Sequence, residues 1–238
     1  MPIGIVSDLL SILIGSIIGI NFKHLMPEGI KVSLIKIFGI CALTIGIVSL
    51  MKINSLPAVI FALIFGYLLG ESLNCDTKLK AFILSVIKKF KSNDIGDHEQ
   101  YIEFYIIVTI TFCASGTNIF GAFNEGISGD SSILISKAVM DILASLIFAS
   151  RLGKPILFIL LPQSCIMLSL FCISNFLTAF ITANMIADFI AIGGLLTIIL
   201  GMSILELITL KLVNLLPALI LIFPVSHFFS LLLTFLHQ

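Results

Sequence analysis

The chain has 238 residues and a formal net charge of zero; 59% of its residues are hydrophobic and 11% are charged. Soluble domains carry about 25% charged residues, so this composition excludes an ordinary soluble fold and indicates a membrane protein. The balanced charge and the single arginine argue against nucleic acid as a partner. The five cysteines form no CxxC or cysteine–histidine cluster, so we expect neither a metal nor another cofactor.

Eight segments are long and apolar enough to be transmembrane helices, which need about 20 residues each. They cover residues 3–21, 33–51, 55–73, 102–122, 132–150, 155–173, 187–206 and 212–235. We therefore predict an all-α protein, a polytopic transmembrane helix bundle of about eight spans.

The segment between the third and fourth spans differs from the rest. In residues 76–91, apolar side chains such as Leu79, Phe82 and Ile83 recur at helical spacing among lysines. This pattern predicts a basic amphipathic helix on the membrane surface, with membrane lipid as its partner. The polar residues 92–100 then form a linker.

The distribution of basic residues predicts the orientation in the membrane. With the N-terminus outside, all of the 13 basic residues except Lys52 and Lys137 lie on the cytoplasmic side. Basic residues favour the cytoplasmic side of a membrane protein. We therefore expect a multi-pass protein of the cell membrane with both termini outside.

The sequence contains an internal repeat. Residues 25–46 align with 180–201, which pairs Gly39 with Gly194 and Gly46 with Gly201. Further on, Asn-Ser-Leu-Pro-Ala aligns with Asn-Leu-Leu-Pro-Ala, and without a gap Asp8 aligns with Gln163. Five spans separate the starts of the two copies, so the second copy enters the membrane from the opposite side. Spans 1–3 and 6–8 thus form a predicted inverted repeat, which is common in secondary transporters.

The repeat defines the predicted organisation of the chain. We expect a first three-helix repeat, a basic interfacial helix with its linker, two central helices that carry a polar site, and a second, inverted repeat. These regions are residues 1–75, 76–100, 101–154 and 155–238.

Two glycine pairs have the spacing of close helix contacts. Gly15 and Gly19 lie four residues apart, as do Gly66 and Gly70. Small residues at this spacing allow helix backbones to approach closely in lipid. The pairs either pack within the bundle or form a homo-oligomer.

The fourth span carries an unusual run of small polar residues, Ser115, Gly116, Thr117 and Asn118. Such residues weaken a regular helix, and a broken helix in a membrane is tolerated only where it is buried or lines water. The run predicts a segment that lines a site. The alternative is a continuous helix with a face of small packing residues.

The fifth span carries Lys137 and Asp141, one turn apart on one helical face, with Ser145 one turn further. A charge at the centre of a spanning helix costs at least about 2.5–3.5 kcal/mol. The pair therefore predicts a solute or ion site, and the alternative is a structural ion pair. Inverted symmetry would bring Asp8 and Gln163 toward the same zone.

The stretch from Cys113 to Ser150 and the segment Asn-Leu-Leu-Pro-Ala (214–218) resemble the YqgA/YdfK-like family of bacterial integral membrane proteins (domain of unknown function 554). Lys137, Val139 and Asp141 match the shared helix motif, and so do Phe148–Ser150. The sequence departs from the pattern at Asp8, where a small polar residue is expected. The resemblance implies a polytopic membrane fold and names no substrate.

These observations favour a transporter or channel for a small polar solute or ion, with a midplane site on the fourth and fifth spans. The alternative is a membrane scaffold or sensor that does not transport and in which Lys137 and Asp141 are structural. The chain lacks the metalloprotease motif H-E-x-x-H, and no nucleophile motif surrounds Ser115 or Ser136. We therefore expect that the protein is not an enzyme.

Overall fold

The computed structural model describes residues 2–21, 27–89, 99–113, 115–177 and 180–236, and every regular element in these ranges is a helix. The helices are α1 (Ile3–Asn21), α2 (Glu28–Leu50), α3 (Leu56–Ser72), α4 (Cys75–Lys89), α5 (Glu99–Cys113), α6 (Gly116–Ser128), α7 (Ser132–Leu152), η2 (Lys154–Ile159), α8 (Leu160–Leu177), α9 (Ala183–Ile204), η3 (Leu212–Leu215) and α10 (Pro217–Leu236).

The helices have the length and apolarity of membrane spans. In the described residues, seven segments pass this test, and α5 and α6 together count as one of them. The remaining predicted span, α3, has 17 residues and continues into α4 across a bend of 54°. A helix of this length reaches about 25 Å, close to the lower limit for crossing a bilayer. The prediction of a polytopic, all-α transmembrane bundle is therefore confirmed.

Polarity is distributed as a membrane requires. Large apolar side chains such as Leu10, Ile64 and Ile220 are exposed on the outer faces of the helices, whereas Asp8 and Lys137 are buried. Charged groups within a membrane almost always face the interior of the bundle, where they find partners. The buried charged side chains in the interior of the bundle are therefore the candidates for a functional site.

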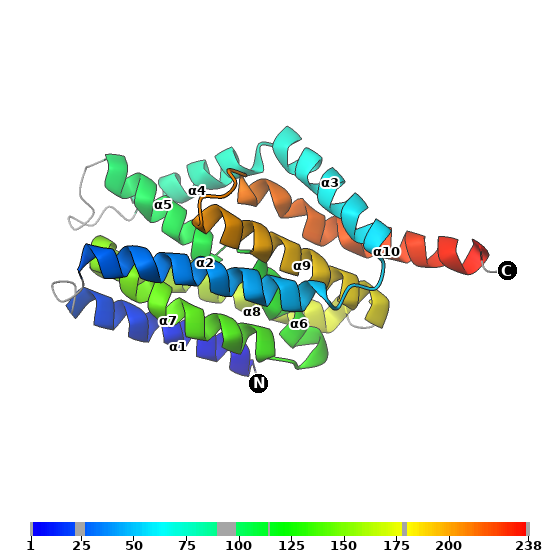
Figure 1. Cartoon of the computed structure of the whole chain (residues 1–238), viewed down its shortest axis with the longest axis horizontal. Coiled ribbons are helices and arrows are strands. Elements are labelled where there is room, and N and C mark those ends of the chain that lie inside the picture. The colour runs from blue at the N-terminus through cyan, green and yellow to red at the C-terminus, as the bar shows by residue number, and fades with distance from the viewer. Residues whose placement is uncertain (1, 22–26, 90–98, 114, 178–179, 237–238) are drawn as a thin grey trace.

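The helices associate in pairs that are distant in sequence. Figure 1 shows α1 beside α7, α2 beside α9 and α3 beside α10, and these pairs are among the most extensive contacts in the bundle. Gly15 and Gly19 of α1 face the backbone of α7, while Gly66 and Gly70 of α3 face α10 and η3. A Cβ at any of these four positions would overlap the neighbouring helix. Both predicted glycine pairs thus pack within the chain.

The contact between α2 and α9 is reciprocal. A Cβ added to Gly46 would lie 2.7 Å from the carbonyl oxygen of Gly194, and one added to Gly194 would lie 2.7 Å from that of Gly46. Gly39 and Gly201 face one another in the same way, with distances of 3.2 and 2.7 Å to each other's carbonyl oxygens. The glycines that the alignment pairs are therefore used in matching contacts on the two helices.

The two Asn-x-x-Pro-Ala segments mark the starts of α3 and α10. Pro57 lies in the first turn of α3 and Pro217 begins α10, positions at which a missing N–H costs no helix hydrogen bond. The side chain of Asn214 accepts a hydrogen bond from the Asp76 N–H (2.8 Å) and donates one to Glu71 (2.5 Å). This second asparagine thus joins η3 to α3 and α4.

The predicted basic helix is present as α4. Phe82 is exposed, Ile83 packs against the bundle, and Lys80 forms an ion pair of 2.9 Å with Asp76. Much of the predicted linker lies outside the described residues, which resume at the start of α5.

The fourth span is interrupted where its small polar run begins. Helix α5 ends at Cys113, and α6 begins at Gly116 with Ser115 as its N-cap, whose hydroxyl accepts from the Asn118 N–H at 3.2 Å. The helix then continues to Ser128 rather than ending near residue 122 as predicted. This extension carries Glu125 into the bundle, where it is buried.

Candidate functional site

Four polar side chains from three helices meet inside the bundle. The Nζ atom of Lys137 on α7 lies 3.0 and 3.1 Å from the two carboxylate oxygens of Asp8 on α1. It also donates to Oδ2 of Asp141, one turn further along α7. The amide of Gln163 on α8 donates to Oδ2 of Asp8 at 2.8 Å. We call these four residues the polar network.

The polar network is enclosed by protein. Asp8 and Gln163 are fully buried, and Lys137 and Asp141 are 5% and 3% exposed. Burying an ion costs roughly several kcal/mol. The attraction to an ion of opposite charge offsets this cost only when the hydrogen-bond geometry of the pair is good. Here one ammonium group bridges two carboxylates, so each ion has a partner of opposite charge.

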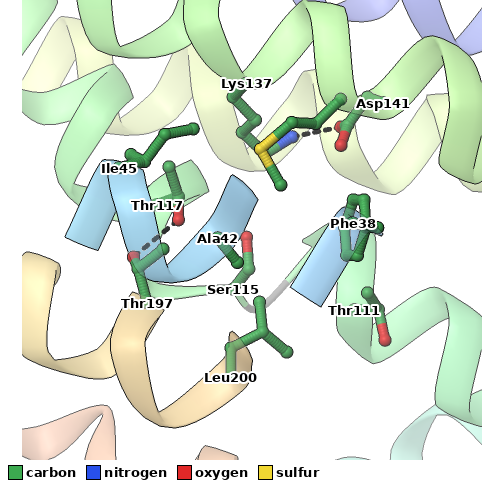
Figure 2. Close-up of a pocket in the computed structure, with 11 residues that line it drawn as sticks. Phe38, Ala42, Ile45, Thr111, Ser115, Thr117, Lys137, Asp141, Thr197 and Leu200 are labelled. Atoms are coloured by element: carbon green, nitrogen blue, oxygen red, sulfur yellow. Dashed lines mark hydrogen bonds and ion pairs between the residues drawn. The ribbon is translucent and has the colours of Figure 1, made fainter. Parts of the chain in front are cut away.

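A small cavity borders one side of the polar network. Figure 2 shows Lys137 and Asp141 on one wall, with Ser115, Thr117 and Thr197 opposite them. Its volume is about 20 Å³, which suffices for one water molecule. The hydroxyls of Thr117 and Thr197 form a hydrogen bond of 2.6 Å, which ties α6 to α9 at this wall of the cavity.

A second cavity adjoins the break in the fourth span. It has a volume of about 30 Å³ and shares Thr111, Ser115 and Leu200 with the first. Leu212 of η3 and Leu216, which follows η3, also line it. The break in the fourth span therefore borders two small spaces, one at the polar network and one toward η3.

The structure brings most of the predicted site residues together. Asp8, Lys137, Asp141 and Gln163 form the polar network, Ser115 and Thr117 line the adjoining cavity, and Gly116 lines the second cavity.

Two predicted residues lie apart from the polar network. Asn118 is buried, with its amide 3.5 Å from the Cys113 carbonyl and its Oδ1 without a hydrogen-bond partner. Ser145 donates to the Ile142 carbonyl at 3.1 Å and lies where α7 meets Gly15. Neither lines the two cavities.

Two other buried carboxylates were missed by the sequence reasoning, and each receives backbone N–H groups at the start of a helix. Glu125 accepts from Gly4 (2.6 Å) and Ile5 (3.1 Å). Asp188 accepts from the backbone of Asn54 (2.9 Å) and Ser55 (2.7 Å) and, through its other oxygen, from the hydroxyl of Ser226 (2.6 Å). The first four N–H groups of a helix lack internal partners, so a carboxylate is a suitable cap.

The signals for these residues differ in strength. Asp188 lies at the start of an apolar span and could have been recognised as an intramembrane charge. Glu125 falls between the predicted spans 102–122 and 132–150, so the sequence gives no signal that it is buried. Within the described residues, no group of three or more His, Cys, Asp or Glu side chains is arranged to hold a metal ion.

Comparisons with known proteins agree with the resemblance seen in the sequence. The family model described as "Protein of unknown function (DUF554)" matches residues 3–227. "Uncharacterized protein YqgA" of Escherichia coli (strain K12) is 37% identical over 227 residues, which cover 95% of this chain and 97% of that protein. "Uncharacterized membrane protein YdfK" of Bacillus subtilis (strain 168) is 25% identical over 235 residues, with coverages of 96% and 98%. No solved structure matches significantly. This polytopic membrane protein therefore belongs to the DUF554 family.

Proposed function

We propose that this protein is a transporter or channel that moves a small polar solute or ion across the cytoplasmic membrane, and that it is not an enzyme. The observation that carries the proposal is the polar network, which borders a cavity lined by the hydroxyls of Ser115 and Thr117 at a broken helix. Intramembrane ionisable residues beside an interrupted helix are the usual construction of a solute or ion pathway.

Stability alone gives no reason for the polar network. Replacing a buried ion pair by well-packed apolar residues of similar volume is often neutral or stabilising. Here three charged side chains, Asp8, Lys137 and Asp141, occupy the interior of a protein whose composition is otherwise strongly apolar. A role in binding explains why they are charged.

The packing also supports the inverted repeat that we propose for α1–α3 and α8–α10. A two-fold axis requires that contacts occur in matching pairs, as in a symmetric dimer. Gly39 with Gly201 and Gly46 with Gly194 form such a pair under the predicted alignment. Asp8 and Gln163, which the alignment makes equivalent, bond directly to one another, as residues next to an axis would.

For the orientation, we propose that both termini lie outside and that Lys154 faces the cytoplasm. Lys52 lies 4.0 Å from Asp130, so the loops that carry them lie at one end of the bundle. In a cysteine-free background, Lys52→Cys should react with an impermeant maleimide in intact cells. Lys154→Cys should react only after permeabilisation, and the reverse pattern would invert the proposed orientation.

A scaffold or sensor is the second candidate, and the small size of the cavity favours it. About 20 Å³ next to Asp141 holds no more than a water molecule or a small ion. In this role the polar network would fix the packing of α1, α7 and α8, and α4 would bind anionic lipid. The two candidates differ in whether the protein moves any solute across the membrane.

The test is a flux and thermal-stability screen of the purified protein against ions, amino acids and small metabolites. Any solute that stabilises the protein is then followed into proteoliposomes. Asp141→Asn should abolish its flux while the protein still inserts and folds, and the surface variant Asp130→Asn should retain it. A screen with no active solute would place the scaffold role first, whereas full flux in Asp141→Asn would show that the polar network is structural in a protein that transports.

A further inference from the structure

We infer that the polar network holds one exchangeable proton, which enters and leaves through Asp141, so that the proposed transport is coupled to protons. This inference rests on the proposed function and specifies the ion that its site binds. It follows from the count of charges, from the hydrogen bonds of the two carboxyl groups and from the space beside them.

The charges in the polar network do not balance. Two carboxylates, Asp8 and Asp141, surround one ammonium group, that of Lys137. With all three groups ionised, the buried site has a net charge of minus one. An unpaired buried charge costs several kcal/mol, roughly, and a buried carboxyl avoids this cost by taking up a proton. One bound proton makes the site neutral.

The two carboxyl groups differ in how well they are satisfied. Asp8 is fully buried, and its oxygens accept two hydrogen bonds from Lys137 and one from Gln163. These charge-assisted bonds stabilise its ionised form. Asp141 accepts only from Lys137, at Oδ2, among the hydrogen bonds of the described residues. It also lines the cavity. The proton therefore has its place on Asp141.

The side-chain oxygen of Gln163 also receives no hydrogen bond from the described residues. This atom, Oε1, is buried and belongs to the amide whose nitrogen lies 2.8 Å from Asp8. Leaving a buried acceptor unpaired costs about 1–3 kcal/mol. If the amide turns over, Oε1 faces Asp8 and can accept a hydrogen bond from its protonated carboxyl. The network thus accommodates an added proton on either acid.

Among the residues that the structure describes, no other charged side chain lines the cavity or pairs with Asp141 to compensate for the imbalance. Helix α1 contributes Asp8, and α8 contributes the uncharged amide of Gln163. The residues that α2, α6 and α9 present to the cavity are uncharged, and η2 presents none. They are Phe38, Ala42, Ile45, Thr117, Thr197 and Leu200.

A proton fits this site better than a metal cation does. The position between the two carboxylates, where a metal ion would bind both, is already occupied by the ammonium of Lys137. The adjoining cavity of about 20 Å³ has room for one water molecule, not for a hydrated ion. One such water beside Ser115 could carry the proton toward the second cavity.

Infrared spectroscopy counts the protonated carboxyl groups directly. Wild-type protein in lipid, at neutral pH and with choline as the only added cation, should show a carboxylic-acid carbonyl band that shifts in D₂O. Asp141→Asn and Asp8→Asn should each lose this band, because each leaves a neutral pair with Lys137. Asp130→Asn should keep it. Lys137→Met should about double it, since two carboxyls then need protons.

The outcomes separate this inference from the proposed function. A wild-type protein without the band, or a band unchanged in both Asp8→Asn and Asp141→Asn, overturns the bound proton. Thermal stabilisation by sodium or potassium without the band assigns the site to that cation instead. A band that behaves as expected, with solute flux that ignores an imposed pH gradient, overturns the coupling and leaves transport standing. No flux of any solute removes the proposed function.

Discussion

Four of the buried carboxylates that the structure describes fall into two kinds, and the difference separates structure from chemistry. Glu125 and Asp188 lie at the starts of α1 and α3, where backbone N–H groups surround them. Asp8 lies in the second turn of α1 and Asp141 in the middle of α7, beyond the free N–H groups of the helix starts, and both depend on Lys137. The first kind is neutralised by fixed dipoles, and the second by a side chain that can move.

This contrast predicts which of the buried acidic side chains can gain or lose a proton. A carboxylate held by backbone N–H groups is stabilised wherever the fold exists, so changing it affects the stability of the fold. A carboxylate held by one lysine next to a cavity can accept a proton or release it without a change of fold. Substitution of a carboxylate that caps a helix should therefore lower stability and leave flux intact. Substitution of Asp141 should abolish flux while the protein still folds.

The largest loss of stability should follow Lys137→Met. It removes the one cation of the polar network and leaves two carboxyls buried together, at a cost of about 3–5 kcal/mol. Thermal unfolding in detergent, followed with a thiol-reactive dye, should show a clear decrease in Tm. The double variant Lys137→Met/Asp141→Asn should recover at least half of the loss. No recovery would mean that Lys137 acts through packing rather than charge.

A smaller loss is expected for Asp188→Ala. It leaves two backbone N–H groups and the Ser226 hydroxyl without their acceptor, which should cost about 1–3 kcal/mol. The same unfolding assay gives the cost, and the flux per folded molecule should remain at the wild-type level. A folded Asp188→Ala protein that does not transport would place Asp188 with the chemical sites.

Glu125→Ala should cost less, about 0.5–2 kcal/mol, the range for the loss of a helix cap. The N–H groups of Gly4 and Ile5 lie in the first turn of α1, where water near the membrane surface can replace the carboxylate. Hydrogen exchange should show faster exchange of these two amides and unchanged protection further along α1. Loss of protection along the whole helix would show that Glu125 anchors α1 as a unit.

The smallest effect should come from Asp130, an exposed acid at the end of the bundle. Hydrogen bonds from the Ser132 side chain and backbone lower its pKa, with a smaller contribution from Lys52. A lowered pKa means that its stabilisation is present above the unfolded pKa of about 3.9 and is lost as the pH falls through the folded pKa. Asp130→Asn should therefore reduce stability at pH 6, by less than about 1 kcal/mol, and less at pH 3. Equal losses at both pH values would contradict this cause.

Much of the fold could be predicted because a membrane imposes strong rules on sequence. Seven of the eight predicted spans pass the length and apolarity test in the described residues, and the third differs only in being short. The boundaries were less certain. The glycines after Asn118 suggested that α6 ends early, but Gly121 packs on Leu134 and Gly126 on Ser174, so these glycines serve close helix contact within a continuing helix.

The polar network could be predicted in part from the high cost of charges in lipid. That cost singled out Lys137 and Asp141, and the internal repeat added Asp8 and Gln163. Spacing along one helix could not show that Lys137 bonds to Asp8 across 129 residues, because this contact depends on the packing of α1 on α7. For the same reason Ser145 shares the helical face of Asp141 and yet lies against Gly15.

The separation of Asp8 from Lys137 has a consequence for how the protein is made. At a synthesis rate of about 5–20 residues per second, the 129 residues between them take roughly 6–26 s to appear. During that interval α1 carries a carboxyl group whose cation does not yet exist. An ionised aspartate within a spanning helix costs free energy, about 2.5–3.5 kcal/mol at the helix centre on insertion scales. The first helix should therefore wait at the insertion machinery, or enter with its carboxyl protonated, and reach its final depth only after α7 has arrived.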